Sequence, residues 1–134
     1  MVAYFIDTDV CVALIRGLAR VSRLPSPDKC ALSAVTTGEL WLGAEKSQQR
    51  DKQLRAVDAF IQFFSELSFD KLAARHYGEI RAHLERQRMP IGPLDQLIAA
   101  HARSLDATLI TANIREFQRV PSLRCLSWKA RTRL

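Results

Sequence analysis

Apolar and polar residues follow two different patterns along this chain. Short apolar runs that end at polar residues predict buried strands, and longer stretches with apolar side chains three or four positions apart predict amphipathic helices. The predicted strands are residues 2–6, 30–34, 66–69, 108–111 and 124–128. The predicted helices are residues 10–16, 36–48, 51–64, 71–88, 94–104 and 115–118.

The alternation of strands with helices predicts the fold class. Helices that connect successive strands favour a parallel sheet with helices on both faces, which is an α/β architecture. The chain has 134 residues with no internal repeat and no linker, so we expect residues 1–134 to form one domain. Ligands of such sheets bind at the carboxyl ends of the strands, and polar residues near these ends are therefore the candidates for chemistry.

Four acidic residues follow the predicted strands or begin the predicted helices. They are Asp7, Glu39, Asp95 and Glu116. Because crowded carboxylates repel one another, such a group is usually neutralised by a divalent cation. Ligation by oxygen alone suits Mg²⁺ or Mn²⁺, and such ions beside a phosphodiester can activate a water for hydrolysis. The acids therefore indicate metal-dependent nuclease chemistry.

Structural roles could also account for most of these acids. Thr36 and Glu39 have the spacing of a capping box, and Asp95 in a first helical turn is favoured by the helix dipole. Glu116 could be a solvated charge on a short helix. Asp7 is the exception, because a buried strand that runs directly into an acid is a typical placement for function.

The composition predicts the kind of partner and the cellular compartment of this protein. The chain has 20 basic and 14 acidic residues, a net charge of +6, and this surplus of cations favours a nucleic acid partner. Without the four candidate acids, 20 basic residues face only 10 acidic ones, so a strongly basic body surrounds the proposed site. Three widely spaced cysteines indicate a reducing, cytoplasmic location. No apolar run is long enough to span a membrane.

Four segments of the chain resemble the motifs of one known family. Residues 5–11, 33–47, 90–102 and 109–121 are similar, in order, to the four motifs of the PIN-domain toxins of type II toxin–antitoxin systems, the VapC family. The resemblance covers nearly the whole chain, and the four motifs together are specific.

The resemblance implies a fold, an activity and partners. The fold would be a three-layer α/β/α sandwich on a parallel sheet. The activity would be that of a magnesium-dependent endoribonuclease that blocks translation by cutting structured RNA, either transfer RNA or ribosomal RNA, with Mn²⁺ as an alternative ion. A VapB-like antitoxin would insert a C-terminal segment into the active-site groove and would bind promoter DNA for the complex. The toxin itself would form a homodimer.

The resemblance also assigns roles to individual residues. Asp7 and Asp95 match the acids that ligate the metal most directly, and Glu39 matches the second acid of the family. The fourth position varies among Asp, Asn and Glu in the family, so either Asn113 or Glu116 could occupy it. All four acids are therefore expected to be catalytic.

Two positions depart from the family pattern. Asp9 stands where Asn is more usual and adds a negative charge beside Asp7, although Asp9 or Thr8 could instead simply cap the first helix. Ala112 stands where many relatives have a polar residue, so the fourth corner of the site is the least defined.

Two other functions fit part of the pattern. A PIN-like module could act with an antitoxin on DNA without cutting RNA. Alternatively, Asp7 and Asp9 could be the nucleophile and the acid/base of a phosphatase of the haloacid dehalogenase type. That family has Thr or Val where Cys11 stands, and it needs a later lysine that has no counterpart near Asp95.

Overall fold

A computed structural model describes residues 2–17, 20 and 23–128, and its centre is a parallel five-stranded sheet. The strands are β1 (Tyr4–Ile6), β2 (Cys30–Ser33), β3 (Ser65–Leu67), β4 (Thr108–Thr111) and β5 (Cys125–Ser127). Their order across the sheet is β3-β2-β1-β4-β5. Each strand lies within one or two residues of its predicted range, so the prediction of a parallel α/β fold is confirmed.

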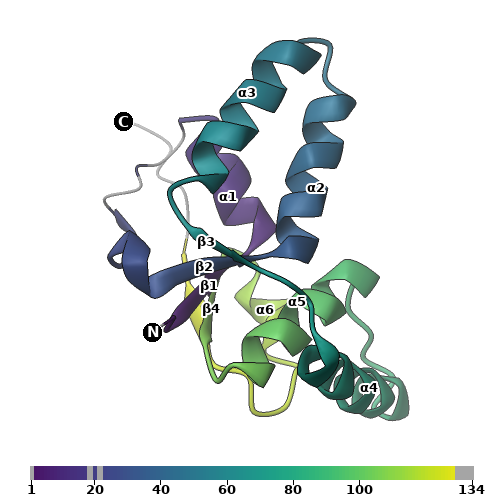
Figure 1. Ribbon diagram of the computed structural model, residues 1–134. Helices are drawn as coiled ribbons and strands as arrows, with labels where there is room; N and C mark the ends of the chain where they lie inside the picture. The colour runs from purple at the N-terminus through teal and green to yellow at the C-terminus, as the bar shows by residue number, and fades with distance from the viewer. Residues whose placement is uncertain (1, 18–19, 21–22, 129–134) are drawn as a thin grey trace.

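Helices connect these strands and cover both faces of the sheet (Figure 1). They are α1 (Thr8–Ile15), the short 3-10 helix η2 (Pro27–Lys29), α2 (Ala34–Glu45), α3 (Arg50–Ile61), α4 (Lys71–Arg86), α5 (Pro93–Ser104) and α6 (Ile114–Phe117). Helices α1, α2 and α3 pack on one face and α4, α5 and α6 on the other. The molecule is therefore a three-layer α/β/α sandwich. None of the helices in the described ranges is long and apolar enough to cross a membrane.

The core consists of two layers because side chains alternate along each strand. Ile6 and Ile110 point to the α1–α3 side, where they pack with Leu32. Their neighbours Phe5 and Leu109 point to the other side and pack against α4 and α5. Both layers are closed to water, which explains why the central strands are continuously apolar in sequence.

Two helices begin differently from what the sequence pattern predicts. Helix α2 starts at Ala34, where the Ser33 hydroxyl accepts a hydrogen bond from the N–H of Val35 at 3.1 Å. Thr36 is therefore buried inside the helix, and the predicted capping box with Glu39 is wrong. The predicted helix start at residue 36 is late because the strand runs directly into the helix without a loop.

Helix α1 is likewise capped by the residue that ends the strand. The Asp7 carboxylate accepts a hydrogen bond from the N–H of Thr8 at 2.9 Å, so neither Thr8 nor Asp9 is the cap. Asp7 thereby has a structural role in addition to any chemical one. At its other end, α1 terminates before Gly17, which has a positive φ of 75° that favours glycine.

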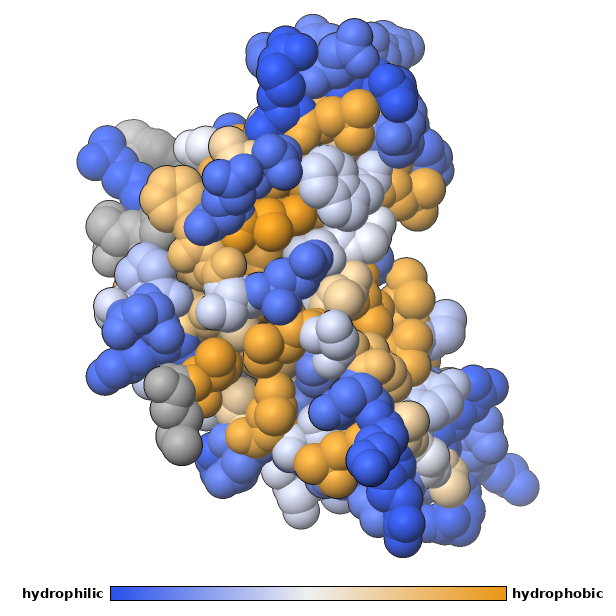
Figure 2. Space-filling view, in the orientation of Figure 1, coloured by the Kyte–Doolittle hydropathy of each residue, from blue (hydrophilic) through white to orange (hydrophobic). Residues whose placement is uncertain are grey.

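The strand order determines where a ligand can bind. From the central strand β1, the chain continues to β2 and β3 on one side and later returns to place β4 and β5 on the other. The connections therefore diverge at the carboxyl ends of β1 and β4, which leaves a crevice there. Figure 1 shows the N-terminal ends of α1, α2 and α5 converging at this edge of the sheet. Figure 2 shows the surface hollowed between the part formed by α2 and α3 and the part formed by α4 and α5.

Candidate active site

A cavity of about 300 Å³ lies at this edge of the sheet and contains most of the candidate residues. Its lining consists of Asp7, Thr8, Asp9, Glu39, Asp95 and Asn113. The residues come from the end of β1, from α1, α2 and α5, and from the turn after β4. Segments that are far apart in sequence meet here because parallel strands present all their carboxyl ends at one edge.

Asp7 is the most deeply buried acid of the site. Its side chain is only 4% exposed, and its carboxylate accepts hydrogen bonds from the Thr8 N–H and from the Thr111 hydroxyl, at 2.9 and 2.7 Å. Burial, together with the negative charge of Asp9, raises the pKa of Asp7 to about 7, although the two hydrogen bonds oppose this shift. At neutral pH, a proton and a metal ion would therefore compete for this carboxylate.

Asp95 is partly exposed at the start of α5 and faces the other acids. Burial and the negative charges of Glu116, Glu39 and Asp9 raise its pKa to about 6. The same charges show that Glu116, although it is not in the cavity lining, lies within electrostatic range of Asp95. The two raised pKa values indicate that negative charge accumulates here without neutralisation.

Two threonines hold the acids in place, and the sequence interpretation gave neither of them this role. The Thr8 hydroxyl donates to Glu39 Oε1 at 2.6 Å and so joins α1 to α2. The Thr111 hydroxyl, which donates to Asp7, also accepts a hydrogen bond from the N–H of Asn113 at 2.9 Å. The sequence signal for both threonines is their place at or just after the end of a central strand.

The two candidates for the fourth corner lie side by side. Asn113 lines the cavity, and its side-chain N–H donates to the carboxylate of Glu116. Glu116 is on α6, one turn after the end of β4. The two residues therefore form one hydrogen-bonded pair at this corner. Ala112 is exposed and does not line the cavity, whereas Asp9 does.

The acids of the site are not paired with basic side chains. Within the part of the chain that the structure describes, ion pairs involve other acids only, and none includes Asp7, Asp9, Glu39, Asp95 or Glu116. This separates the site from the remaining surface, where arginines pair with nearby carboxylates. A cluster of carboxylates without a protein cation is the arrangement that a divalent metal ion stabilises.

The donor set fits a magnesium ion that keeps most of its water. All candidate ligands are oxygen atoms, which excludes the nitrogen and sulfur ligation typical of zinc. In the described ranges, no three His, Cys, Asp or Glu side chains are close enough to surround one ion directly. Mg²⁺ commonly binds through one or two carboxylates and retains several waters, and a cavity of this size accommodates such a hydrated ion.

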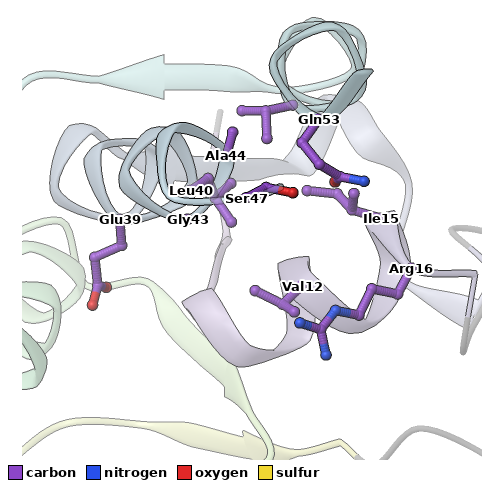
Figure 3. Close-up of a pocket in the computed structure, with 10 residues that line it drawn as sticks. Val12, Ile15, Arg16, Glu39, Leu40, Gly43, Ala44, Ser47 and Gln53 are labelled. Atoms are coloured by element: carbon purple, nitrogen blue, oxygen red, sulfur yellow. The ribbon is translucent and has the colours of Figure 1, made fainter. Parts of the chain in front are cut away.

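A second cavity of about 360 Å³ adjoins the first (Figure 3). It lies between α1, α2 and α3, and its walls include the apolar side chains of Val12, Ile15, Leu40 and Val57. Glu39 lines both cavities, and Figure 3 shows its carboxylate pointing away from the other residues of the second one. A groove with both apolar and polar walls therefore leads to the edge of the acidic cavity.

Comparison with known proteins identifies the class to which this fold and site belong. Residues 4–123 match the PIN domain family. The chain is 40% identical over 131 residues to a Shigella flexneri protein named tRNA(fMet)-specific endonuclease VapC, covering 96% of this chain and 99% of the relative. It is 37% identical over 131 residues, with the same coverage, to a Haemophilus influenzae protein named Ribonuclease VapC2.

Solved structures agree with this match. The DNA-bound VapBC of Salmonella typhimurium has a TM-score of 0.91 at 38% identity, covering 96% of this chain and 100% of that chain. VapBC2 of Rickettsia felis, bound to a promoter DNA fragment, has a TM-score of 0.89 at 32% identity, covering 95% and 99%. The chain therefore belongs to the PIN-domain family and, within it, to the VapC ribonucleases. This membership confirms the resemblance seen in the sequence and rules against the phosphatase hypothesis based on Asp7 and Asp9.

Proposed function

We propose that this protein is a magnesium-dependent endoribonuclease toxin, that residues 1–134 form one nuclease domain, and that it cuts transfer RNA in the cytoplasm. The observation that carries the proposal is the group of four carboxylates that line one cavity at the divergence of β1 and β4, with Glu116 within electrostatic range of Asp95 and no basic partner among the described residues. Such a group is electrostatically unfavourable by itself and becomes favourable when a divalent cation binds.

Different parts of the protein would bind the metal ion and the RNA substrate. Asp7 and Asp95 would ligate the metal, with Glu39 and the pair of Asn113 and Glu116 binding its waters. Bound Mg²⁺ supplies an activated water and stabilises the charge of a phosphodiester under attack. Thr8 and Thr111 orient two of the carboxylates. The basic surface of the chain would hold the RNA backbone.

The relatives support transfer RNA as the substrate and an antitoxin as the partner. Two of the similar curated proteins are named as endonucleases specific for tRNA(fMet), and several similar structures are VapBC complexes, some bound to DNA. A VapB-like antitoxin would place a segment along the groove between α1, α2 and α3 and over the acidic cavity, and would carry the complex to promoter DNA. The chain alone would form a homodimer.

Cleavage of purified transfer RNA tests the proposal. The protein, freed of antitoxin, is expected to cut total transfer RNA in Mg²⁺ and to stop when EDTA is added. Asp95→Asn should slow cleavage at least about 100-fold, because it removes a metal ligand. Asp58→Asn, which changes an exposed acid of α3, is the matched control and should cut at the wild-type rate. Sequencing the 5′ ends of the products identifies the cleaved RNA.

The result also decides between cleavage and a binding function alone. If the wild-type protein binds transfer RNA but yields no new 5′ ends in Mg²⁺ or Mn²⁺, the non-cleaving PIN module is the better description. Equal cleavage by the wild-type protein and Asp95→Asn would place the active site elsewhere in the chain.

A further inference from the structure

In the turn that precedes α5, three consecutive carbonyl groups, those of Pro90, Ile91 and Gly92, each accept a hydrogen bond. Arg119 Nη1 donates to the carbonyl of Pro90, and Gln96 Nε2 donates to that of Ile91, each at 3.0 Å. The backbone N–H of Gln96 donates to the carbonyl of Gly92, also at 3.0 Å. The bond to Gly92 is the first backbone hydrogen bond of α5, so the bond to Ile91 is the contribution of the Gln96 side chain to this turn.

Asp95 lies next to this turn, and its carboxylate has no hydrogen-bond donor of its own among the described residues. Asp7 and Glu39, by contrast, each accept a hydrogen bond from a threonine hydroxyl. Asp95 Oδ2 instead lies against Gly92, where an added Cβ atom would be only 3.2 Å away. The position of this carboxylate is consequently set by the backbone of the turn and by the missing side chain of Gly92.

The amide of Gln96 is not explained by packing of the core. The side chain is 6% exposed, and its Oε1 atom is buried without a hydrogen-bond partner among the residues that the structure describes. An unpaired buried acceptor costs about 1–3 kcal/mol. Methionine has a similar length and would fill the same space without this penalty. The hydrogen bond from Nε2 to Ile91 is the one contribution that an apolar side chain could not make.

We propose that Gln96 is a positioning residue for the Asp95 carboxylate. By clamping the turn at the Ile91 carbonyl, the Gln96 side chain holds Asp95 in the cavity beside Asp7 and Glu39, and the absence of a side chain at Gly92 leaves room for the carboxylate. The inference rests on the proposed function, because it takes Asp95 to be a ligand of the magnesium ion.

Calorimetric titration with Mg²⁺ tests the role of Gln96 apart from catalysis. Gln96→Met is expected to bind Mg²⁺ about 10-fold more weakly, as is typical when a group that orients a metal ligand is lost. Its melting temperature should change little, because the lost hydrogen bond is offset by removal of the unpaired oxygen. Gln62→Met, at an exposed glutamine that follows α3 and lines neither cavity, is the control and should bind Mg²⁺ like the wild type.

A second pair of variants tests the contact with Gly92 without altering Gln96. Gly92 has a φ of −54°, which alanine also adopts, so Gly92→Ala acts only through the added methyl group. We expect Mg²⁺ affinity to fall by about 3- to 10-fold. Gly38→Ala is the control, since its Cβ meets no atom within 4 Å although it precedes Glu39.

Each outcome separates this inference from the proposed function. If the wild-type protein binds Mg²⁺ and Gln96→Met binds it equally well, the inference is wrong and the proposed function stands. The same holds if Gln96→Met melts earlier with unchanged affinity, because Gln96 would then be purely structural. If Gln96→Met does not fold, wild-type affinity in Gly92→Ala overturns the inference. A wild-type protein that binds no Mg²⁺ would overturn both.

Discussion

Charged side chains have opposite surroundings in two regions of this molecule. On the α4–α5 side of the sheet, Arg103 is mostly covered, with a side chain 12% exposed, and every arm of its guanidinium has a partner. It donates to His76 Nδ1 at 2.8 Å, to the carbonyl of Pro121 at 3.1 Å and to the carboxylate of Glu79. At the carboxyl edge of the sheet, four acids line one cavity and Glu116 lies within electrostatic range of Asp95, and none of the five has a basic partner among the described residues.

The difference shows which region serves the fold and which serves chemistry. A covered charge normally requires compensating hydrogen bonds and an opposite charge, and the Arg103 network supplies both. The acidic site lacks the opposite charge, and burial together with the neighbouring negative charges raises the pKa values of Asp7 and Asp95. The protein provides no compensating positive charge there, and we propose that a bound magnesium ion provides it.

Removing the charge of Asp7 should produce the largest difference between the two regions. Asp7→Asn should reduce RNA cleavage about 1,000-fold, because the most buried metal ligand is lost. The same change should raise the free energy of unfolding of the metal-free protein at pH 8 by about 1–3 kcal/mol, since an amide avoids the cost of a buried charge and can still cap α1. Urea denaturation in EDTA measures the second effect.

Asp106→Asn is the matched control for this experiment. Asp106 is an exposed acid that is paired with Arg124, so neither activity nor stability should change by more than a small amount. A metal-free Asp7→Asn protein that is less stable than the wild type would show that the Asp7 charge supports the fold.

The Arg103 network should respond in the opposite manner. Arg103→Met is expected to lower the free energy of unfolding by about 2–3 kcal/mol, because three hydrogen bonds, two to α4 and one to Pro121, are lost together. The cleavage rate per folded molecule should stay at the wild-type value. Arg81→Met, which removes an exposed pair with Glu85, is the control and should cost less than about 1 kcal/mol. Loss of activity with unchanged stability in Arg103→Met would contradict the division into two regions.

The pH dependence of stability tests the same comparison with the smallest expected effect. Asp7 and Asp95 have raised pKa values of about 7 and about 6, so between about pH 4 and pH 7 the folded state binds more protons than the unfolded state. Their contribution to stability is therefore present at low pH and lost as the pH rises to about 7. We expect the metal-free protein to lose about 2 kcal/mol of unfolding free energy between pH 5 and pH 8.

Saturating Mg²⁺ should restore this stability at pH 8 and have little effect at pH 5, where protons occupy the site. Denaturation curves at the two pH values, with EDTA or with Mg²⁺, measure both effects. Asp7→Asn serves as the control and should flatten the dependence. A wild-type protein that becomes more stable from pH 5 to pH 8 in EDTA would refute the assignment.

Much of the fold could be predicted because local patterns and tertiary packing agree. The run at Thr108–Thr111 is apolar, bounded by polar residues and buried in the sheet, and its bounds were predicted without error. Helix starts were predicted less well. Ser33 ends β2 and also caps α2, and no periodic pattern separates the two roles.

The site was predictable to the extent that acids at strand ends must share an edge of a parallel sheet. This placed Asp7, Glu39 and Asp95 together, and their roles as metal ligands stay predictions. The contacts that orient these acids could not be predicted in the same way. Thr8 reaches Glu39 across 31 positions of the chain, a contact that depends on how α1 packs against α2.

The architecture, the family and the set of acids available for chemistry follow from the sequence alone, because these depend on residue type, order and periodicity. How those acids are held follows from the tertiary structure. It showed that Thr111 donates to Asp7, that Asn113 and Glu116 form one pair, and that Asp95 depends on the turn clamped by Gln96. The physical reason is that hydrogen bonds and burial depend on distances of a few ångströms between segments distant in sequence, and side-chain spacing along one segment does not encode them.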